Sequence, residues 1–349
     1  MNNKTDIKSL TLPELTTFIT TLGEKGFRAK QIYEWIHVKL AENFEEMSNL
    51  SKGLQTKLKD TCNYQVLKMV EKLESSDKET TKYLFALNDG RVLESVLMKY
   101  KHGNSVCISS QVGCKMGCKF CASTIGGFER NLTPSEMLSQ IYEIQRMSGE
   151  RVSNVVVMGT GEPLDNFDNL LTFIDLLTNE HGLNISQRNI TVSTCGLVEK
   201  IIELADKKLQ ITLALSLHAP NDAARRELMP IANRYSLKEV IKACEYYYNQ
   251  TGRRITFEYS MVYWVNDTPE QGKELVNLLK GLNCHVNLIP VNPIKEREYK
   301  QSKAKNIQDF KNLLEKNRIN VTIRREMGTD INAACGQLRK SYMDGNLII

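Results

Sequence analysis

The sequence predicts an α/β fold, in which a partial (β/α)6 barrel follows a small helical N-terminal domain and a β-hairpin. Three patterns carry this prediction: apolar residues at helical spacing near the N-terminus, an Asp-Gly turn between two apolar runs, and a long region where short apolar runs alternate with amphipathic stretches. The 349 residues are also enough for one large domain and an accessory domain.

Residues 1–75 are expected to form the helical accessory domain. Apolar residues recur there at helical spacing in three short stretches, and the first stretch stops at Gly23, a residue typical of helix C-termini. The apolar positions are Leu12, Leu15, Phe18, Ile19 and Leu22, then Ile32, Trp35, Ile36 and Leu40, then Leu54 and Leu58.

Residues 76–104 are expected to form a β-hairpin that links the two domains. The runs Tyr83–Leu87 and Val92–Met98 flank Asn88-Asp89-Gly90, and Asp-Gly between two apolar runs is a strong hairpin signal.

Residues 105–349 are expected to form the barrel. Thr133-Pro134-Ser135-Glu136 has the pattern of a helix start, with a capping Thr, Pro at the first helical position and Glu two residues later. Repeated strand–helix units imply parallel strands whose carboxyl ends open to one side, where a site is expected. The predicted strands are Val106–Ser109, Asn154–Met158, Ile190–Ser193, Ile211–Leu217, Ile255–Tyr259, Val286–Ile289 and Val321–Ile323.

Composition indicates a cytoplasmic protein. No apolar run approaches the roughly 18–20 residues needed to span a bilayer, and the polar N-terminus lacks a signal-peptide pattern. The net charge of +5 is mild, and basic residues concentrate between residues 295 and 340. This basic segment could attract phosphates. The alternative is a solvated surface helix with a few additional lysines. Nine cysteines in such a compartment favour metal binding or thiol chemistry over structural disulfides.

Three of the cysteines, Cys114, Cys118 and Cys121, lie on one short loop after the first predicted barrel strand. Three soft ligands without a nearby fourth suit a 4Fe–4S cluster with one open iron, whereas a zinc site or buried thiols are the alternatives. The CxxxCxxC spacing, with Phe120 before the last cysteine, resembles the signature of the radical S-adenosylmethionine (SAM) superfamily. The resemblance implies a radical SAM partial (β/α)6 barrel with SAM and a 4Fe–4S cluster as cofactors.

Residues at the following strand ends are the candidate SAM contacts. Met158-Gly159-Thr160-Gly161-Glu162-Pro163 resembles the methionine-binding turn of the superfamily, in which Glu162 would bind the ammonium group. Each of these residues taken singly is more often a turn or cap residue. The candidates are Gly161, Glu162, Ser193, Ser216, Leu217, His218 and Asn292.

Two longer motifs make the resemblance more specific. The stretch from Cys107 to Cys114, CISSQVGC, and the stretch from Ala333 to Leu338, AACGQL, are similar to the radical SAM RNA adenine methyltransferases. This resemblance covers nearly the whole chain. It implies methylation of C2 of an adenine at the peptidyl-transferase centre of 23S ribosomal RNA, and of an adenine beside the tRNA anticodon. It also implies that the N-terminal helices bind RNA.

The family's scheme assigns a role to each further cysteine. Adenine C2 is electrophilic, so a nucleophile must first take the methyl group from SAM, and that nucleophile is Cys335. A second SAM, cleaved at the cluster, gives the radical that removes hydrogen from the methyl on Cys335, and the resulting methylene radical joins C2. Cys107 then releases the product as a disulfide with Cys335, which thiol reductants reopen.

The base that removes the C2 proton is the least defined part of the scheme. Glu94 matches the family's proton acceptor, but an exposed strand carboxylate is an equal interpretation, and a Cys107 thiolate could do the same job. The expected partners are 23S rRNA, tRNA and an electron donor such as flavodoxin or ferredoxin, with no membrane, and the protein is expected to be a monomer.

Three alternatives stay open. Sister enzymes of the family that confer antibiotic resistance methylate C8 of the same adenine and share all five functional cysteines. Another radical SAM class, such as an activase or a thiolation enzyme, would require a second cluster or a glycyl-radical partner. A zinc-binding RNA module without enzymatic activity would be colourless rather than brown. The stretches around Glu162, His218 and Asn292 look more like the C2 branch.

Overall fold

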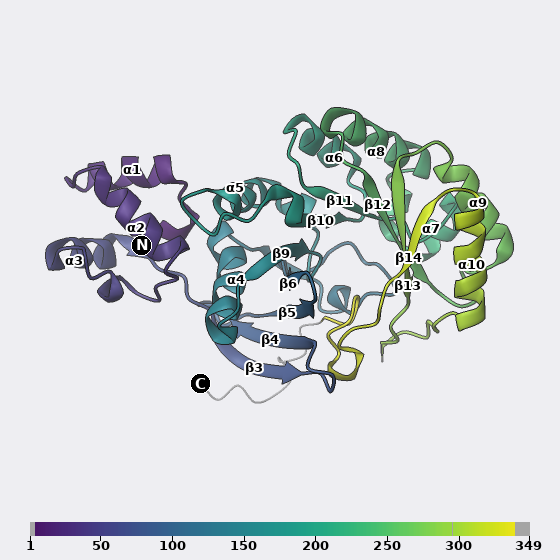
Figure 1. The fold of residues 1–349 in the computed structure, drawn as a ribbon, viewed down its shortest axis with the longest axis horizontal. Coiled ribbons are helices and arrows are strands. Elements are labelled where there is room, and N and C mark those ends of the chain that lie inside the picture. Colours follow the sequence, from purple (N-terminus) through teal and green to yellow (C-terminus); the bar gives the residue numbers. More distant parts are fainter. Residues whose placement is uncertain (1–3, 295, 339–349) are drawn as a thin grey trace.

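A single mixed sheet of ten strands organises the part of the chain that the computed structural model describes, residues 4–294 and 296–338. Its strand order is β14-β13-β12-β11-β10-β9-β6-β5-β4-β3 (Figure 1). The edges β14 and β3 are not paired with each other, so the described sheet is an open barrel.

The barrel part of the sheet is parallel from β6 to β14. Its inner strands are Val-, Ile- and Leu-rich and largely buried, as parallel strands covered by helices are, whereas no residue of the edge strand β14 is buried. The strands are β6 (Gly103–Ile108), β9 (Val152–Val157), β10 (Ile190–Thr194), β11 (Thr212–Ser216), β12 (Ile255–Met261), β13 (Cys284–Pro290) and β14 (Asn320–Ile323). All seven predicted barrel strands are thus confirmed, with ends that differ by up to three residues.

Helices connect these strands and cover the outer face of the sheet (Figure 1). The predicted helix start at Thr133 is confirmed, because its side chain and that of Glu136 form a reciprocal capping box. The helices are α4 (Pro134–Ser148), α5 (Phe167–Thr178), α6 (Val198–Asp206), α7 (Asp222–Leu228), α8 (Leu237–Thr251), α9 (Pro269–Leu279) and α10 (Ala304–Lys316). The partial (β/α) barrel predicted from the sequence is therefore confirmed.

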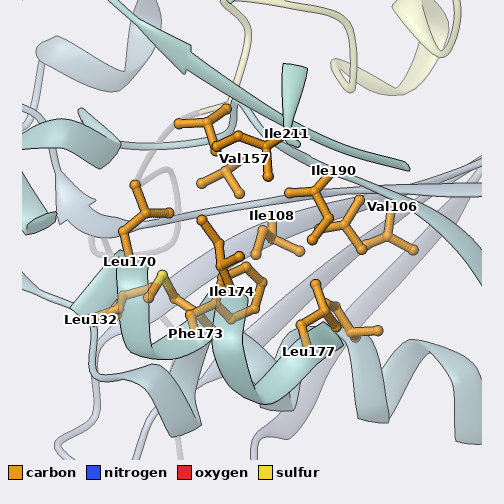
Figure 2. Packing of buried hydrophobic residues seen from close by; sticks show 14 of the residues in the cluster. Val106, Ile108, Leu132, Val157, Leu170, Phe173, Ile174, Leu177, Ile190 and Ile211 are labelled. Atoms are coloured by element: carbon orange, nitrogen blue, oxygen red, sulfur yellow. The ribbon is translucent and has the colours of Figure 1, made fainter. Parts of the chain in front are cut away.

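The core lies between the helices and the inner strands. Figure 2 shows one side of it, where Phe173 and Ile174 of α5 face Ile108 of β6 and Val157 of β9. All four side chains are at most 1% exposed. Burying each such side chain stabilises the fold by about 1.5–3 kcal/mol, which fixes the strands whose carboxyl ends carry the site.

The hairpin is confirmed and extends the barrel sheet. Strands β4 (Thr80–Ala86) and β5 (Val92–Tyr100) pair antiparallel around Asp89, and β5 pairs antiparallel with β6. The sequence analysis did not predict the outermost strand, β3 (Lys68–Glu74), and placed its residues in the helical domain. None of the β3 residues is buried, so this edge strand has no apolar face to mark it.

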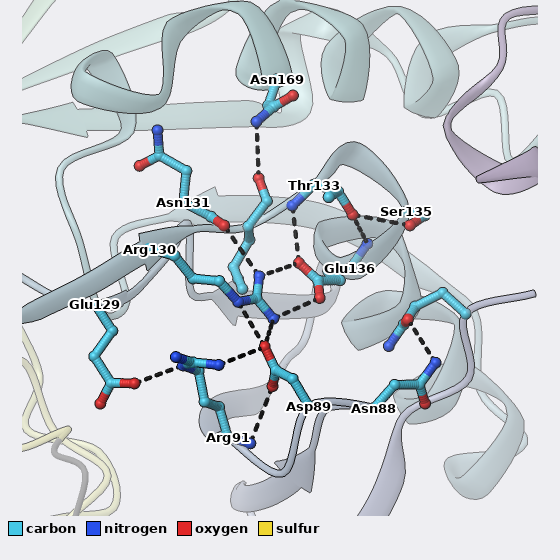
Figure 3. A network of polar contacts seen from close by, with 12 residues as sticks. Asn88, Asp89, Arg91, Glu129, Arg130, Asn131, Thr133, Ser135, Glu136 and Asn169 are labelled. Atoms are coloured by element: carbon cyan, nitrogen blue, oxygen red, sulfur yellow. Dashed lines mark hydrogen bonds and ion pairs between the residues drawn. The ribbon is translucent and has the colours of Figure 1, made fainter. Parts of the chain in front are cut away.

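A polar network holds the hairpin turn against the cluster loop. Asp89 accepts hydrogen bonds from Arg91 (2.9 Å) and from Arg130 of β8 (Phe128–Asn131) at 2.7 Å. Arg130 also makes a bidentate pair with Glu136 at the start of α4, at 2.8 Å for both contacts (Figure 3). Bidentate arginine–carboxylate pairs are geometrically specific, so the turn, β8 and α4 are held in one arrangement.

The three predicted N-terminal helices are present as α1 (Leu12–Thr21), α2 (Phe27–His37) and α3 (Lys52–Thr61). The short strands β1 (Thr5–Asp6) and β2 (Cys62–Asn63) pair in parallel next to them. The helices lie at the end of the molecule opposite α9 and α10 (Figure 1). Asp6 joins them to the barrel, because its carboxylate accepts a hydrogen bond from Ser135 of α4 at 2.6 Å.

None of the helices in the described residues is long and apolar enough to cross a membrane.

Candidate active site

The loop that carries Cys114, Cys118 and Cys121 connects β7 (Gln111–Gly113) to β8. Gly113 has φ +74°, and a Cβ at this position would lie 1.8 Å from the carbonyl oxygen of Gly127. This close approach lets the Cys114 amide donate to Gly127 at 3.0 Å and closes the base of the loop. Glycine is therefore required where the loop begins.

The three thiols line one cavity at the carboxyl ends of the barrel strands. Burial, together with the neighbouring thiols Cys121 and Cys114, raises the pKa of Cys118 well above its usual value of 9. Among the described residues, no three His, Cys, Asp or Glu side chains are arranged as the ligands of a single metal ion. The cavity wall also includes six of the seven predicted contacts, from four strand ends: Gly161, Glu162, Ser193, Ser216, His218 and Asn292.

Glu162 is buried in this wall. Its two carboxylate oxygens accept backbone hydrogen bonds from Leu164 (3.0 Å) and Cys195 (2.8 Å). Burial raises the pKa of Glu162, whereas these hydrogen bonds lower it. The preceding Gly161 has φ +109°, and a Cβ there would lie 2.6 Å from the Gln111 side chain. A fixed carboxylate beside open space is suited to an ammonium group.

His218 is held as a neutral ring. Its Nδ1 accepts a hydrogen bond from the Ser260 amide at 2.9 Å, and its ring meets the edge of Phe120 with centroids 4.6 Å apart. Burial, followed by the charge of Arg225, lowers the pKa of His218 to about 3. At neutral pH its Nε2–H is therefore available as a donor toward the cavity.

Leu217 is the one predicted SAM contact whose side chain does not reach this cavity. It is fully buried in the main hydrophobic core, while its amide donates to Glu258 and its carbonyl accepts from Arg225. The alternation of side chains along β11 explains the difference, because Ser216 faces the cavity and its neighbour faces away.

Sequence reasoning missed Arg225, which is fully buried beneath the cavity. Its guanidinium donates to the carbonyl oxygens of Cys195 (2.7 Å), Ser216 (3.3 Å) and Leu217 (3.3 Å). It thereby ties together the ends of β10 and β11. The available signal was weak, because charge in a helix is usually a mark of an exposed face.

A second cavity adjoins the first and contains Cys107 and Cys335. Cys335, Asn292 and Met158 line both cavities, so the two spaces meet at these residues. Cys107 is on β6, opposite Val96 of β5. The structure therefore brings both predicted thiols to the space next to the cluster loop.

Three parts of the fold hold the loop that carries Cys335. Asn292, after β13, donates to the carbonyl oxygen of Cys335 at 3.0 Å. The Ala122 amide of the cluster loop donates to Gly336 at 2.8 Å, and Lys82 of the hairpin donates to Asn332 at 3.3 Å. The loop is thus held against the barrel, the cluster loop and the hairpin.

Arg324, which follows β14, is a second missed residue. Its guanidinium lies 3.6 Å from Glu258 and 3.7 Å from the sulfur of Met158, and it lines the cavity of the two thiols. Burial raises the pKa of Cys335 and raises that of Cys107 to about 12, and the charge of Arg324 opposes both shifts. Its position directly after a predicted strand was the signal that could have identified it.

Glu94 lies near these thiols but lines a different cavity. It is buried on β5, 3.5 Å from the ammonium nitrogen of Lys82, in a small space with Ser123 and Thr160. Its side chain shares a face of β5 with Val96, the residue opposite Cys107. It is therefore buried and ion-paired rather than the exposed strand carboxylate considered from the sequence.

Two family models match the chain. A model of the ribosomal RNA large subunit methyltransferase N-terminal domain matches residues 5–63, and a model of the radical SAM superfamily matches residues 108–279. The barrel and its cysteine loop are thus those of a radical SAM protein. A solved structure of a radical SAM methyltransferase from Sphaerobacter thermophilus is 42% identical, with a TM-score of 0.93, and the match covers 96% of this chain and 99% of that chain.

Full-length relatives define the family more narrowly. A probable dual-specificity RNA methyltransferase RlmN from Lachnoclostridium phytofermentans is 64% identical over 100% of this chain and 98% of its own length. One from Lachnospira eligens is also 64% identical, over 97% of each chain. The chain belongs to the RlmN family of dual-specificity RNA methyltransferases.

The residues present fit the cofactors of this class. Three soft thiolate donors on one short loop that faces the cavity suit an iron–sulfur cluster, since thiolates are its usual ligands. The open space beside them is bordered by the Glu162 carboxylate, the Asn292 amide and the hydroxyls of Ser193 and Ser216. These groups match the ammonium, carboxylate and ribose groups of SAM.

Proposed function

We propose that this protein methylates C2 of an adenine in 23S ribosomal RNA, at the peptidyl-transferase centre, and an adenine beside the anticodon of transfer RNA. One observation carries the proposal: Cys335 borders both the cavity of the three clustered thiols and the cavity of Cys107. A thiol in this position can meet SAM on one side and the RNA base on the other.

The first step is the transfer of a methyl group to Cys335. Its thiolate attacks the sulfonium methyl of SAM, a C–S bond forms, and S-adenosylhomocysteine leaves. Arg324 favours the thiolate, because its positive charge lowers the pKa of Cys335 against the effect of burial. Glu162 would hold the ammonium group of SAM, and Asn292 orients the Cys335 backbone.

The second step uses the methyl group on Cys335. A 4Fe–4S cluster held by Cys114, Cys118 and Cys121 would supply the electron that cleaves a second SAM. The 5′-deoxyadenosyl fragment of this SAM would take a hydrogen atom from the methyl and leave as 5′-deoxyadenosine, and the methylene radical left on Cys335 joins adenine C2. The adduct then loses the C2 proton to a base and one electron, which would return to the cluster. Cys107 forms an S–S bond with the sulfur of Cys335, the S–CH2 bond breaks, and the carbon takes a proton.

Glu94 and Cys107 are both proposed as the group that takes the C2 proton. Cys107 is supported by its place in the cavity of Cys335. Glu94 is supported by its burial on the same face of β5 as Val96, with the ammonium of Lys82 3.5 Å from its carboxylate. Replacing Glu94 by Gln should abolish turnover only if Glu94 is the base.

The remaining assignments complete the proposal. SAM and a 4Fe–4S cluster are the cofactors, and the electron donor is a protein such as flavodoxin or ferredoxin. The three N-terminal helices contact RNA, because the family model matched there belongs to a ribosomal RNA methyltransferase. We propose a monomer that acts in the cytoplasm.

The rival reaction is methylation of C8 of the same rRNA adenine. It would use the same five cysteines, so the cysteines do not distinguish the two. The C2 reaction is favoured because the relatives at 57–64% identity carry the name of the dual-specificity enzyme.

The deciding experiment is mass spectrometry of nucleosides after anaerobic reaction of the reconstituted protein with protein-free 23S RNA, SAM and a reductant. We expect 2-methyladenosine. An 8-methyladenosine product would assign the protein to the C8-methylating enzymes that confer antibiotic resistance. A brown protein that cleaves SAM without methylating adenosine would refute the RNA reaction.

Single cysteine variants test the two thiol roles. Cys335→Ala should abolish methylation and leave no methylated cysteine, because the acceptor is gone. Cys107→Ala should accumulate protein covalently bound to RNA, visible as a shifted band after denaturing electrophoresis. Normal turnover by the Cys107 variant would rule out the resolving role, and Cys284→Ala, a buried thiol away from the site, is the control.

A further inference from the structure

Trp264 is the most exposed of the large hydrophobic side chains in the described residues. It is 75% exposed, whereas the next, Phe27, is 55% exposed. Its backbone has φ +60°, a left-handed conformation that a bulky residue adopts only under strain. Packing within the fold does not account for an exposed, strained aromatic residue at this position, so a role in function is the hypothesis to consider.

The turn around Trp264 is firmly held. Val262 is fully buried, and Val265 packs in the same cluster as Met116 and Phe120 of the cysteine loop. The Trp264 amide donates to Asp267 at 2.9 Å, and Asn306 donates to the other carboxylate oxygen at 3.0 Å. The exposure of the ring is therefore a property of an ordered turn.

This turn adjoins the site. It follows β12, whose residue Ser260 lines the cavity of the three clustered thiols. Asn266, two residues after Trp264, donates to the carbonyl oxygen of His218 at 2.7 Å and to that of Ser260 at 2.6 Å. Trp264 thus lies on the loop that follows β12, on the face of the barrel where the strands end and both cavities open.

Basic residues surround the turn. The Tyr263 amide donates to the carbonyl oxygen of Lys300 at 2.9 Å, and the ammonium of Lys303 lies 5.4 Å from the centre of the Tyr263 ring. The segment 297–305 contains four basic residues and a single carboxylate, Glu298. Lys303 therefore lies against the Tyr263 ring, whose centre is 5.7 Å from the centre of the Trp264 ring.

We propose that Trp264 is a stacking platform for an unpaired base of the RNA substrate, with Lys300 and Lys303 contacting the adjoining phosphates. An adenine that reacts in a buried site must leave its stack, which deprives a neighbouring base of its partner. An aromatic ring on the loop after β12, at the face where the barrel strands end, replaces that partner, and nearby lysines neutralise the backbone. This inference rests on the proposed RNA reaction and adds the residue that receives the RNA.

Fluorescence gives a direct test, because the chain has only two tryptophans. In a Trp35→Phe protein with its cluster reconstituted, Trp264 is the remaining emitter. Titration with a 23S RNA hairpin that contains the target adenine should quench this emission strongly, since a stacked base quenches indole. Emission that is unchanged at saturating RNA would refute the stacking.

Substitutions test the same contact by affinity. Trp264→Ala should weaken binding of the hairpin about tenfold, whereas Trp264→Phe should stay within about threefold, because a ring remains. Tyr246→Ala on α8, another exposed aromatic residue, should bind normally. Affinity unchanged in Trp264→Ala, in a preparation whose wild type produces methyladenosine, would overturn the inference and leave the proposed function intact.

Folding and the electron donor need separate controls. Trp264→Asn should be at least as stable as the wild type in thermal melts, because Asn tolerates the left-handed conformation. Cleavage of SAM without RNA, driven by dithionite, should be unchanged in Trp264→Ala. A loss of rate that occurs with flavodoxin but disappears with dithionite would assign this turn to the donor protein and overturn the proposal.

Discussion

Arg324 places a positive charge in the cavity that contains the two reactive thiols, Cys107 and Cys335. The guanidinium is 3.6 Å from Glu258, and Glu258 is itself positioned by a 2.9 Å hydrogen bond from Asn287. This arrangement keeps a cation beside Cys335 in a place where burial alone would disfavour a thiolate. A partly buried cation is costly unless it is paired, and the buried Glu258 carboxylate offsets this cost for Arg324.

Replacing Arg324 by Gln should slow methylation of Cys335. Without the cation the pKa of Cys335 rises further, so the rising limb of the rate against pH should move to higher pH, with about a tenfold loss at pH 7.5 for each pKa unit. The measurement is the mass of the Cys335 peptide over time, from pH 7 to 9.5. Arg325→Gln is the matched control, because Arg325 lines the same cavity but pairs with Glu79 at the surface. A pH profile that does not move would reject the electrostatic role.

At the scale of elements, local patterns predicted most of the fold. The Asp89-Gly90 turn, the Thr133 cap and the apolar barrel strands depend on neighbouring residues, so they could be read from short stretches. The strand β3 could not, because its residues are exposed and its pairing with β4 comes from the tertiary structure. Strand propensity reflects mainly the packing of half-buried side chains, so an exposed strand leaves little pattern in the sequence.

Local patterns also predicted one part of the site and not another. The ends of the predicted strands identified Glu162, Ser193 and Asn292 as candidates, because parallel strands bring their carboxyl ends together. The position of the Cys335 loop depends instead on contacts with the hairpin and the cluster loop, more than 200 residues earlier. The placement of that loop came from the resemblance to a family and not from any local pattern.

Two glycines of the cysteine loop, Gly113 and Gly127, allow a matched test of the close approach at its base. Gly113→Ala would place a Cβ 1.8 Å from the Gly127 carbonyl oxygen, whereas Gly127→Ala, at a similar φ of +69°, meets nothing within 4 Å. Gly113→Ala should therefore lose most of its bound iron after reconstitution. Gly127→Ala should lose only about 1 kcal/mol from backbone strain and keep its iron. Iron and sulfide analysis measures the difference, and equal iron contents would show that the close approach is not needed.

At the scale of the whole molecule, the N-terminal helices depend on buried polar contacts for their attachment to the barrel. His37 at the end of α2 is fully buried and lies 2.6 Å from the hydroxyl of Tyr142 on α4. Its Nε2 has no hydrogen-bond partner among the described atoms. Lys8, also buried, stacks on the Tyr64 ring at 4.3 Å. Protonation of His37 would thus add an unpaired charge beside an existing cation.

This contact predicts a specific loss of stability in acid. Burial, followed by the charge of Lys8, lowers the pKa of His37 from 6.5 to about 3. A depressed pKa in the folded state means that the unfolded chain binds the proton first, so stability is full above pH 6.5 and falls as the pH drops toward 3. Between pH 6.5 and 5 the loss should be about 2 kcal/mol. The buried Lys8, with its pKa lowered to about 8, titrates in a higher window, between pH 10.5 and 8.

His37→Asn isolates this contribution, because Asn keeps a hydrogen-bonding group toward Tyr142 and does not titrate. His218 shares the low pKa but is present in both proteins, so it cancels in the comparison. Urea unfolding under anaerobic conditions, followed at Trp35 on α2 in a Trp264→Phe background, reports the N-terminal helices. We expect the wild type to lose stability between pH 6.5 and 5 more steeply than His37→Asn. Parallel curves would mean that the helices are attached without dependence on a neutral His37, and the acid sensitivity would then have to come from the barrel.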